Sequence, residues 1–466
     1  MTVQITNDQA TDGAAAGVLA DVRRVFNSGR TRPLTWRSEQ LRAVERMCEE
    51  REPEIAEALA SDLGRSSFEA WLGDIGSTKA EAAFARKHLK KWVKPQKYAL
   101  PLAQLPGKGW VQYDPLGVIL VIGPWNYPFY LCMAPVVAAI AAGNAMVIKP
   151  SELAPATSAL IARLVPEYLD SEAIRVVEGD AAVTQDLMEQ GFDHALFTGG
   201  TEIGRKIMAA AAPTLTPVTL ELGGKSPVVV LADADLDVAA RRIAWIKMLN
   251  SGQTCIAPDY VLADRTIAAE LADKIVATIA AFRAEEKDPS LRIVNERQFD
   301  RLVSLISATS GTVVTGGGSD RAALRIEPTV IVNPAADDPV MSDEIFGPIL
   351  PIIAVDSPDA AVAFVNARPK PLALYVFTAS QQAARDLVDR MPSGGAVVNH
   401  VAVHCLVPQL PFGGVGASGM GAYHGKWGFE ALSHRRAVLA KSTKLDLKLM
   451  YPPYTDRAIR LMRKVM

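Results

Sequence analysis

The chain has 466 residues, of which 49% are hydrophobic and 21% charged, and its 49 basic residues nearly balance its 51 acidic ones. This composition excludes a disordered chain and a strongly basic surface for polyanions, so nucleic acid is not an expected partner. At about 150 residues per domain, the length predicts two or three structural units.

The N-terminus and the apolar runs give no sign of export or membrane insertion. Residues 1–8 lack a basic start followed by an apolar segment, so no secretory signal is expected. The longest apolar runs, 116–122 and 131–142, fall short of the ~20 residues that a membrane-spanning helix requires. We therefore expect a cytoplasmic protein.

The cysteines Cys48, Cys132, Cys255 and Cys405 lie far apart and form no Cys-x-x-Cys pair. This spacing argues against a zinc site and a redox dithiol, and it predicts reduced thiols and no bound metal.

Residues 18–97 place apolar side chains at helical spacing among many charges, which predicts packing helices rather than a helix that recruits a partner. Prolines at 95, 101 and 106 end this pattern, and residues 110–113 read as a short strand.

After Gly117, short apolar strands alternate with Ala-rich helices, such as 154–164 and 203–212. This alternation predicts right-handed crossovers and a largely parallel, doubly wound sheet of Rossmann-like outline. The expected strands are 118–122, 145–148, 174–177, 194–198 and 227–231.

A second α/β unit is expected from residue 233 onward, and it contains Cys255. Its expected helices are 267–283, 298–306 and 360–366, and its expected strands are 329–332, 350–354 and 373–378. The glycine-rich junction at 222–227 suits the floor of a cleft between the two units.

Two segments set a carboxylate and a thiol among glycines and small polar residues. Leu-Glu-Leu-Gly-Gly-Lys (220–225) contains Glu221, and Asn-Ser-Gly-Gln-Thr-Cys (250–255) contains Cys255. Covalent acyl transfer needs an attacking thiolate and a base that later activates water. Taken singly, a buried thiol and a surface carboxylate are the commoner interpretation.

Both segments resemble signatures of the aldehyde dehydrogenase superfamily. Five more motifs follow in that family's order: Pro-Trp-Asn-Tyr-Pro (124–128), Ile-Lys-Pro-Ser-Glu (148–152), Phe-Thr-Gly-Gly-Thr-Glu-Ile-Gly (197–204), Glu-Ile-Phe-Gly-Pro (344–348) and Pro-Phe-Gly-Gly-Val-Gly (411–416). Ser-Gly-Met-Gly-Ala-Tyr-His-Gly-Lys (418–426) and Tyr-Pro-Pro-Tyr (451–454) look most like the class 3 branch of fatty, aromatic and coniferyl aldehyde dehydrogenases. The resemblance covers nearly the whole chain from about residue 18.

The patterns and the resemblance together imply an α/β fold with four parts. These are a Rossmann-like NAD(P)-binding domain (1–98 and 117–224), an α/β catalytic domain (225–398), a small β oligomerisation element with the C-terminal segment (99–116 and 399–445), and a basic tail (446–466). The resemblance implies a homodimer formed through the β element. Basic and apolar residues alternate at 441–448 and 457–464, so weak contact with an anionic membrane stays open beside the favoured solvated helix.

The strand–turn–helix at 194–204 offers a helix N-terminus to a pyrophosphate, although its glycines lack the G-x-G-x-x-G spacing. The resemblance adds NAD(P), with Lys149 and Glu152 at the adenosine ribose and Glu344 and Phe346 at the nicotinamide. Glu152 would repel a 2′-phosphate, which favours NAD, whereas Lys149 would offset that charge and leaves NADP open. The expected cofactor residues are Trp125, Lys149, Glu152, Thr198, Gly199, Gly204, Leu222, Glu344 and Phe346.

The resemblance implies that Cys255 attacks an aldehyde, and that the Asn126 amide and the Cys255 N–H hold the oxyanion. Hydride then leaves for the nicotinamide, and Glu221 activates the water that hydrolyses the thioester. No cationic residue lies near Cys255 in sequence, so any cation that ionises it comes from the fold or the cofactor. A cofactor-independent thiol esterase and a non-catalytic scaffold are the alternatives, and the presence of both Cys255 and Glu221 disfavours the scaffold.

Apolar side chains close to these motifs form the expected substrate pocket: Tyr127, Phe129, Trp245, Met248 and Phe412. Trp245 and Met248 lie three residues apart and share a helix face, although core packing is the commoner role at that spacing. No Arg occupies these stretches, so a pocket lined by these residues is expected to select an apolar aliphatic or aromatic aldehyde, as a small-molecule substrate, over a charged semialdehyde.

Overall fold

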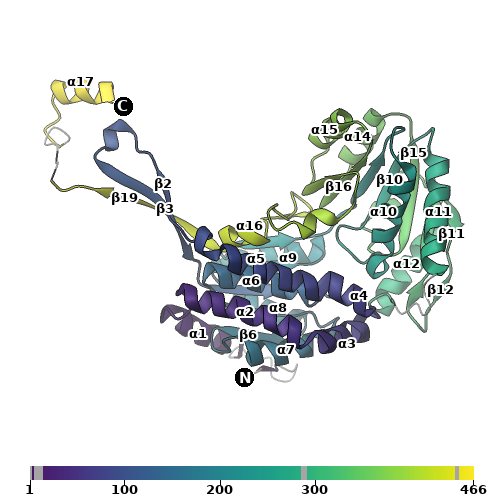
Figure 1. The fold of residues 1–466 in the computed structure, drawn as a ribbon, viewed down its shortest axis with the longest axis horizontal. Coiled ribbons are helices and arrows are strands. Elements are labelled where there is room, and N and C mark those ends of the chain that lie inside the picture. Colours follow the sequence, from purple (N-terminus) through teal and green to yellow (C-terminus); the bar gives the residue numbers. More distant parts are fainter. Residues whose placement is uncertain (1–2, 5–13, 285–290, 445, 447–450, 466) are drawn as a thin grey trace.

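The computed structural model describes residues 3–4, 14–284, 291–444, 446 and 451–465. Two seven-stranded sheets with helices on their faces form the body, and a three-stranded arm extends from one side (Figure 1). The predicted α/β fold class is therefore confirmed.

The first sheet is built from apolar strands that are covered on both faces, which is why it is mainly parallel. Every residue of its central strand, β4, is buried. The order is β1 (Val3–Gln4), β6 (Ile174–Glu178), β5 (Ala145–Lys149), β4 (Val118–Ile122), β7 (His194–Thr198), β8 (Val218–Glu221) and β18 (Gly419–Met420), with only β18 antiparallel to its neighbour.

Helices cover both faces of this sheet. They are α1 (Ala14–Asn27), α2 (Leu34–Glu50), α3 (Glu52–Leu63), α4 (Ser67–Ala70), α5 (Gly76–Trp92), α6 (Tyr130–Ala142), α7 (Pro155–Tyr168), α8 (Ala181–Glu189) and α9 (Thr201–Ala211), with a π-helical turn at Trp71–Ile75 between α4 and α5. From β4 the chain first adds β5 and β6 on one side and then returns to place β7 on the other. Ligands bind in open α/β sheets at such a reversal, beyond the carboxyl ends of the strands.

The second sheet has the order β11 (Thr312–Thr315), β14 (Thr329–Val332), β15 (Ile349–Val355), β10 (Tyr260–Asp264), β9 (Pro227–Val230), β16 (Ala373–Phe377) and β17 (Gly395–Val398). Its pairs are parallel except β11 with β14. It carries α10 (Leu236–Met248), α11 (Ala268–Ala284), α12 (Glu296–Ala308), α13 (Pro339–Ser342), α14 (Pro358–Asn366) and α15 (Gln381–Arg390), and a small hairpin of β12 (Ser319–Asp320) and β13 (Arg325–Ile326) lies beside it.

One strand assignment needs correction. The run 227–231, expected in the first sheet, is β9 of the second sheet, where it pairs with β10 and β16. The strand missing from the prediction is β8, which ends at Glu221 and pairs with β7. The strand has only four residues, Val-Thr-Leu-Glu, and two of them are polar, so it does not stand out in the sequence as an apolar run. The predicted domain limits remain a prediction.

The arm consists of β2 (Gln96–Tyr98), β3 (Gly107–Pro115) and β19 (Ser433–Lys441), all antiparallel. Helix α16 (Gly425–Ala431) leads into β19, and α17 (Asp456–Val465) lies beyond it (Figure 1). Part of the basic stretch at 441–448 falls outside the described residues, whereas 457–464 lies in α17. Within the described ranges, no helix has the length and apolar character needed to cross a bilayer.

Candidate active site

A cavity with about 1680 Å³ of empty space, part of it open solvent, lies at the reversal point of the first sheet. Five of the expected cofactor residues line it: Trp125, Lys149, Glu152, Thr198 and Gly199. The start of α9 faces the same space, so its free N–H groups suit a pyrophosphate. The Thr198 hydroxyl is buried there without a hydrogen-bond partner, as expected of a group that awaits a polar ligand.

Lys149 is held in place at the rim of this cavity. Its ammonium donates to Glu152 Oε2 at 2.9 Å and to the Gly179 carbonyl at 2.8 Å. The two residues expected at the ribose therefore form an ion pair. This pair partly neutralises Glu152, and so weakens the sequence argument against a 2′-phosphate.

The other four expected cofactor residues do not line this cavity. Gly204 and Leu222 pack on each other, since a Cβ at Gly204 would lie 2.6 Å from Leu222 Cδ2. Phe346 meets the Trp125 ring edge-on, with centroids 5.3 Å apart. Glu344 lies so close to Gly223 that a Cβ there would be 1.9 Å from its Oε2. Burial raises the pKa of Glu344 to about 8.

The nucleophile loop follows the end of α10 in an unusual backbone conformation. Asn250 and Ser251 both have φ 52°, in the left-handed region that costs a non-glycine residue about 1–2 kcal/mol. The strain is held by hydrogen bonds, because the Asn250 amide donates to the carbonyls of Asn126 and Gln253, each at 3.0 Å. Asn126 in turn donates from Nδ2 to the Gln253 carbonyl at 3.1 Å. These bonds bring Asn126 and the Cys255 loop together, as expected for an oxyanion site.

Arg65 anchors this arrangement, and it was not anticipated from the sequence. Its guanidinium pairs with Asp74, donates to the Asn126 carbonyl, and donates from Nε to Asn250 Oδ1 at 3.2 Å. Both charged groups are buried. The network joins three segments that are distant in sequence, so no local pattern could have revealed it.

Burial disfavours the charged forms of both Cys255 and Glu221. Burial raises the pKa of the Cys255 thiol well above its usual value of 9.0, and the acidic groups of Glu344 and Glu221 add to this effect. Burial also raises the pKa of Glu221 well above 4.5, and neither of its carboxyl oxygens has a hydrogen-bond partner. Among the described residues, the side chains that shift this pKa include no cation, so the surroundings of Cys255 favour the protonated thiol.

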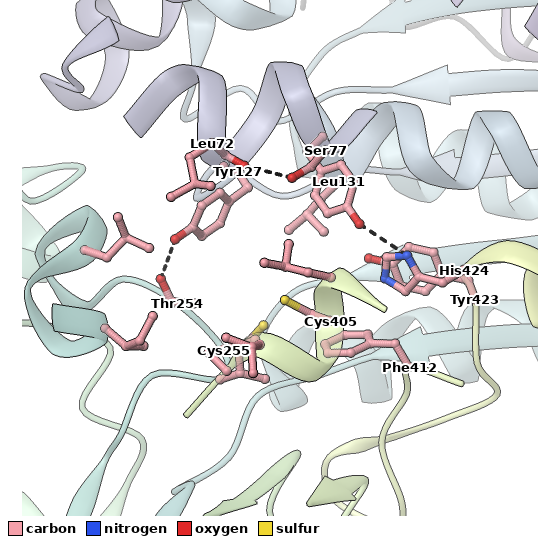
Figure 2. Close-up of a pocket in the computed structure, with 18 of the residues that line it drawn as sticks. Leu72, Ser77, Tyr127, Leu131, Thr254, Cys255, Cys405, Phe412, Tyr423 and His424 are labelled. Atoms are coloured by element: carbon pink, nitrogen blue, oxygen red, sulfur yellow. Dashed lines mark hydrogen bonds between the residues drawn. The ribbon is translucent and has the colours of Figure 1, made fainter. Parts of the chain in front are cut away.

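Cys255 lies in the wall of a second cavity, with about 830 Å³ of empty space (Figure 2). Three of the five expected pocket residues line it: Tyr127, Trp245 and Phe412. The cavity also has walls that the sequence did not indicate, including Leu72, Tyr130, Leu131, Leu249, Cys405, Tyr423 and His424. Its surface is almost entirely apolar.

Two pocket expectations are corrected by the structure. Phe129 is fully buried in the core of the first sheet, and its neighbour Tyr130 faces the cavity instead. Met248 borders a different cavity, whereas Leu249 lines this one. The side of this segment that faces the cavity carries Trp245, Ile246 and Leu249, at i, i+1 and i+4, so Met248 falls beside that face although it is three residues from Trp245. Within the described residues, no cluster of His, Cys, Asp or Glu suits a metal ion.

Comparisons with known proteins agree with this geometry. The aldehyde dehydrogenase family matches residues 2–438. The chain is 45% identical to aldehyde dehydrogenase family 3 member H1 of Arabidopsis thaliana, with 96% of this chain and 94% of the relative covered. It is also 45% identical to the mouse protein named "Aldehyde dehydrogenase, dimeric NADP-preferring", over 94% of this chain and 97% of the relative. A substrate-bound structure of Staphylococcus aureus AldH superposes with a TM-score of 0.93 at 40% identity, over 97% of this chain and 99% of the other.

Proposed function

The chain belongs to the aldehyde dehydrogenase family, whose activity is NAD(P)-dependent oxidation of aldehydes, and we propose that Cys255, Asn126 and Glu221 carry this reaction here. One observation supports the assignment above the others. The Asn126 amide is tied to the Cys255 loop through the Gln253 carbonyl, and the thiol faces an apolar cavity. A carbonyl held at the Cys255 sulfur would lie beside the loop to which the Asn126 amide is bonded.

In the first step the Cys255 thiol gives up its proton to solvent and its sulfur adds to the aldehyde carbon, and negative charge develops on the former carbonyl oxygen. One N–H of the Asn126 amide is engaged by Gln253, so the second is free to stabilise this oxyanion together with the backbone N–H of Cys255. NAD(P), when bound, accepts the hydride that leaves the adduct. Cys255 is left as a thioester.

Glu221 then removes a proton from the water that attacks the thioester. Its lack of hydrogen-bond partners and its raised pKa make it a better base than an exposed carboxylate. Glu221 acts in its carboxylate form and takes one proton from the water as the water oxygen adds to the acyl carbon. The C–S bond then breaks, the carboxylic acid leaves, and Glu221 returns the proton to the sulfur, which regenerates the Cys255 thiol.

The cavity chemistry supports an apolar aliphatic or aromatic aldehyde as substrate. Apart from a few hydroxyl, histidine and thiol groups, its walls are aliphatic and aromatic. Its lining residues include no arginine or lysine that could pair with a carboxylate on the substrate. For the cofactor, the Lys149–Glu152 pair supports use of both NAD and NADP.

The test is formation of NADH or NADPH, followed at the nicotinamide absorbance, when an aldehyde series is added with each cofactor. Cys255→Ala should abolish turnover and retain cofactor binding, measured by quenching of protein fluorescence. Full activity in this variant would reassign the nucleophile, and ester hydrolysis without aldehyde oxidation would favour a thiol esterase.

We further propose a cytoplasmic homodimer that uses the arm. Its strand β19 is largely exposed, with Leu439 50% accessible, and the mouse relative is named dimeric. Light scattering of the full chain tests the dimer, and cell fractionation tests the location. Peripheral membrane contact by α17 is tested by sedimentation with anionic vesicles, with and without the residues after Tyr454; equal sedimentation would refute it.

A further inference from the structure

One corner of the substrate cavity is polar. Figure 2 shows Tyr423 and His424 together there, with Cys255 and Cys405 on a neighbouring wall. Tyr130 lines the same corner, with its hydroxyl 3.2 Å from His424 Nδ1. Because the rest of the lining is almost wholly apolar, this corner is the place where a bound molecule would gain from a polar atom.

The His424 ring is fixed by partners on several sides. Its Nδ1 lies 3.2 Å from the Tyr130 hydroxyl and 3.5 Å from Glu81 Oε2. The other oxygen of Glu81 accepts the Gly425 N–H at 2.5 Å. The ring also stacks on Tyr423, with centroids 4.3 Å apart. His424, Glu81 and Tyr423 are all buried, so the cluster is preorganised.

The backbone of His424 is strained. Its φ of 102° with ψ of 133° lies where glycine is the usual residue, and such a conformation costs of order 1–3 kcal/mol. Strain of this kind persists only where the surroundings hold it, and it concentrates at ligand-binding positions. Here the hydrogen bonds and stacking of the ring hold it.

Tyr130 is the partly exposed residue of this cluster, since Tyr423 and His424 are both buried. It is the first residue of α6, and its N–H donates to Asp74 Oδ1 at 2.8 Å, so the buried Arg65–Asp74 pair positions it as well as Asn126. Burial and the nearby Glu81 raise the pKa of Tyr130 well above 10, so the hydroxyl keeps its proton.

The direction of that proton depends on the tautomer of His424, and the Glu81 carboxylate beside Nδ1 favours the tautomer that carries its proton there. In that tautomer Nδ1 has no lone pair to accept from Tyr130, so the Tyr130 oxygen accepts from Nδ1–H. The Tyr130 O–H is then left to donate into the cavity. An oxygen atom on a bound molecule is the natural acceptor.

We infer that the aldehyde oxidised by this protein carries an oxygen-bearing substituent, such as a hydroxyl group, remote from the reacting carbon, and that Tyr130 donates a hydrogen bond to it. Tyr130 is the binding residue, and His424 is a positioning residue that acts through it. The inference rests on the proposed function, since it concerns the same cavity.

The experiment compares substrates that differ only in the polar atom. We choose 3- and 4-hydroxybenzaldehyde against 3- and 4-methylbenzaldehyde, and measure kcat/KM for each with the full-length protein. The hydroxyl compound should be preferred about fivefold or more at one of the two ring positions, as one net hydrogen bond allows. Tyr130→Phe should reduce this ratio to near one.

Matched variants separate recognition from structure. Tyr127→Phe removes a hydroxyl from the same cavity, one that bonds Thr254 Oγ1 at 2.8 Å, and should keep the preference. His424→Ala should lower the ratio, and His424→Asn, whose amide reaches the position of Nδ1, should restore part of it. If these residues had a purely structural role, their replacement would lower kcat/KM equally for the hydroxyl and the methyl compound of each pair.

Two results would overturn the inference: no preference in either pair with the unmodified protein, or a preference that survives Tyr130→Phe. An equal loss on both members of a pair in Tyr130→Phe, including complete loss, also overturns it. Failure of the proposed function looks different, because no aldehyde would then yield NADH or NADPH.

Discussion

Replacing Asn126 by Ala removes the amide that we place at the oxyanion. The side chain is 4% exposed, so water cannot take over its role, and one N–H is already committed to Gln253 at 3.1 Å. Loss of a single preorganised donor lowers kcat by about 100- to 1000-fold, or about 2.7–4 kcal/mol. We therefore expect kcat and kcat/KM to fall together by this factor, because the interaction forms mainly in the transition state.

The control must exclude a displaced Cys255 loop. Alkylation of Cys255 by iodoacetamide uses the same sulfur but develops no oxyanion, so its rate at fixed pH should stay within about twofold of wild type in Asn126→Ala. Peptide mass spectrometry distinguishes Cys255 from Cys405, which faces the same cavity. A kcat within threefold of wild type, or an alkylation rate that falls in parallel with kcat, would refute the assignment.

Three more outcomes follow from the described contacts. Arg65→Met leaves Asp74 buried without its cation and should lower the free energy of unfolding by about 3–5 kcal/mol in urea titrations; Asp74→Asn added to it should recover part of that loss, and no recovery would contradict the charge argument. Glu152→Gln removes a negative charge near the expected 2′-phosphate and should raise the NADP-to-NAD ratio of kcat/KM about five- to tenfold, whereas an unchanged ratio would place the ribose elsewhere. Because burial raises the pKa of Cys255 above 9.0, its alkylation rate in the free protein should climb about tenfold per pH unit up to pH 9, and a plateau near pH 7 would reveal an unseen cation.

The sequence predicted the fold class because buried parallel strands are unmistakable when nearly every residue is apolar. β4 and β7 have the bounds expected from such runs. β8, which ends at Glu221, was not predicted because the strand is short and only part of it is apolar. Strand 227–231 was recognised as a strand but not as part of the second sheet, since pairing partners are a tertiary property.

The sequence was informative about site residues that lie in short motifs. It did not reveal contacts between residues that are distant in sequence. Trp125, Thr198 and Gly199 line one cavity, because they lie at or just beyond the ends of the adjacent strands β4 and β7. Their role in cofactor binding remains a prediction. The sequence placed Phe129 in the substrate cavity, but the structure places its neighbour Tyr130 there. Which of the two aromatic side chains faces the cavity depends on how α6 begins, where Asp74 accepts hydrogen bonds from the N–H groups of both residues. Arg65, Glu81 and His424 come from distant segments, and their convergence has no local signature.

The most direct test is chemical trapping of the thioester. Glu221→Gln, mixed with NAD and an aldehyde and quenched rapidly, should release about one equivalent of NADH in a burst and carry the acyl group on Cys255, seen by peptide mass spectrometry. Steady turnover should then be slower by about 100- to 10,000-fold, the usual contribution of a general base. An acyl group on Cys405 or on no cysteine, with turnover unchanged, would contradict the roles given to Cys255 and Glu221.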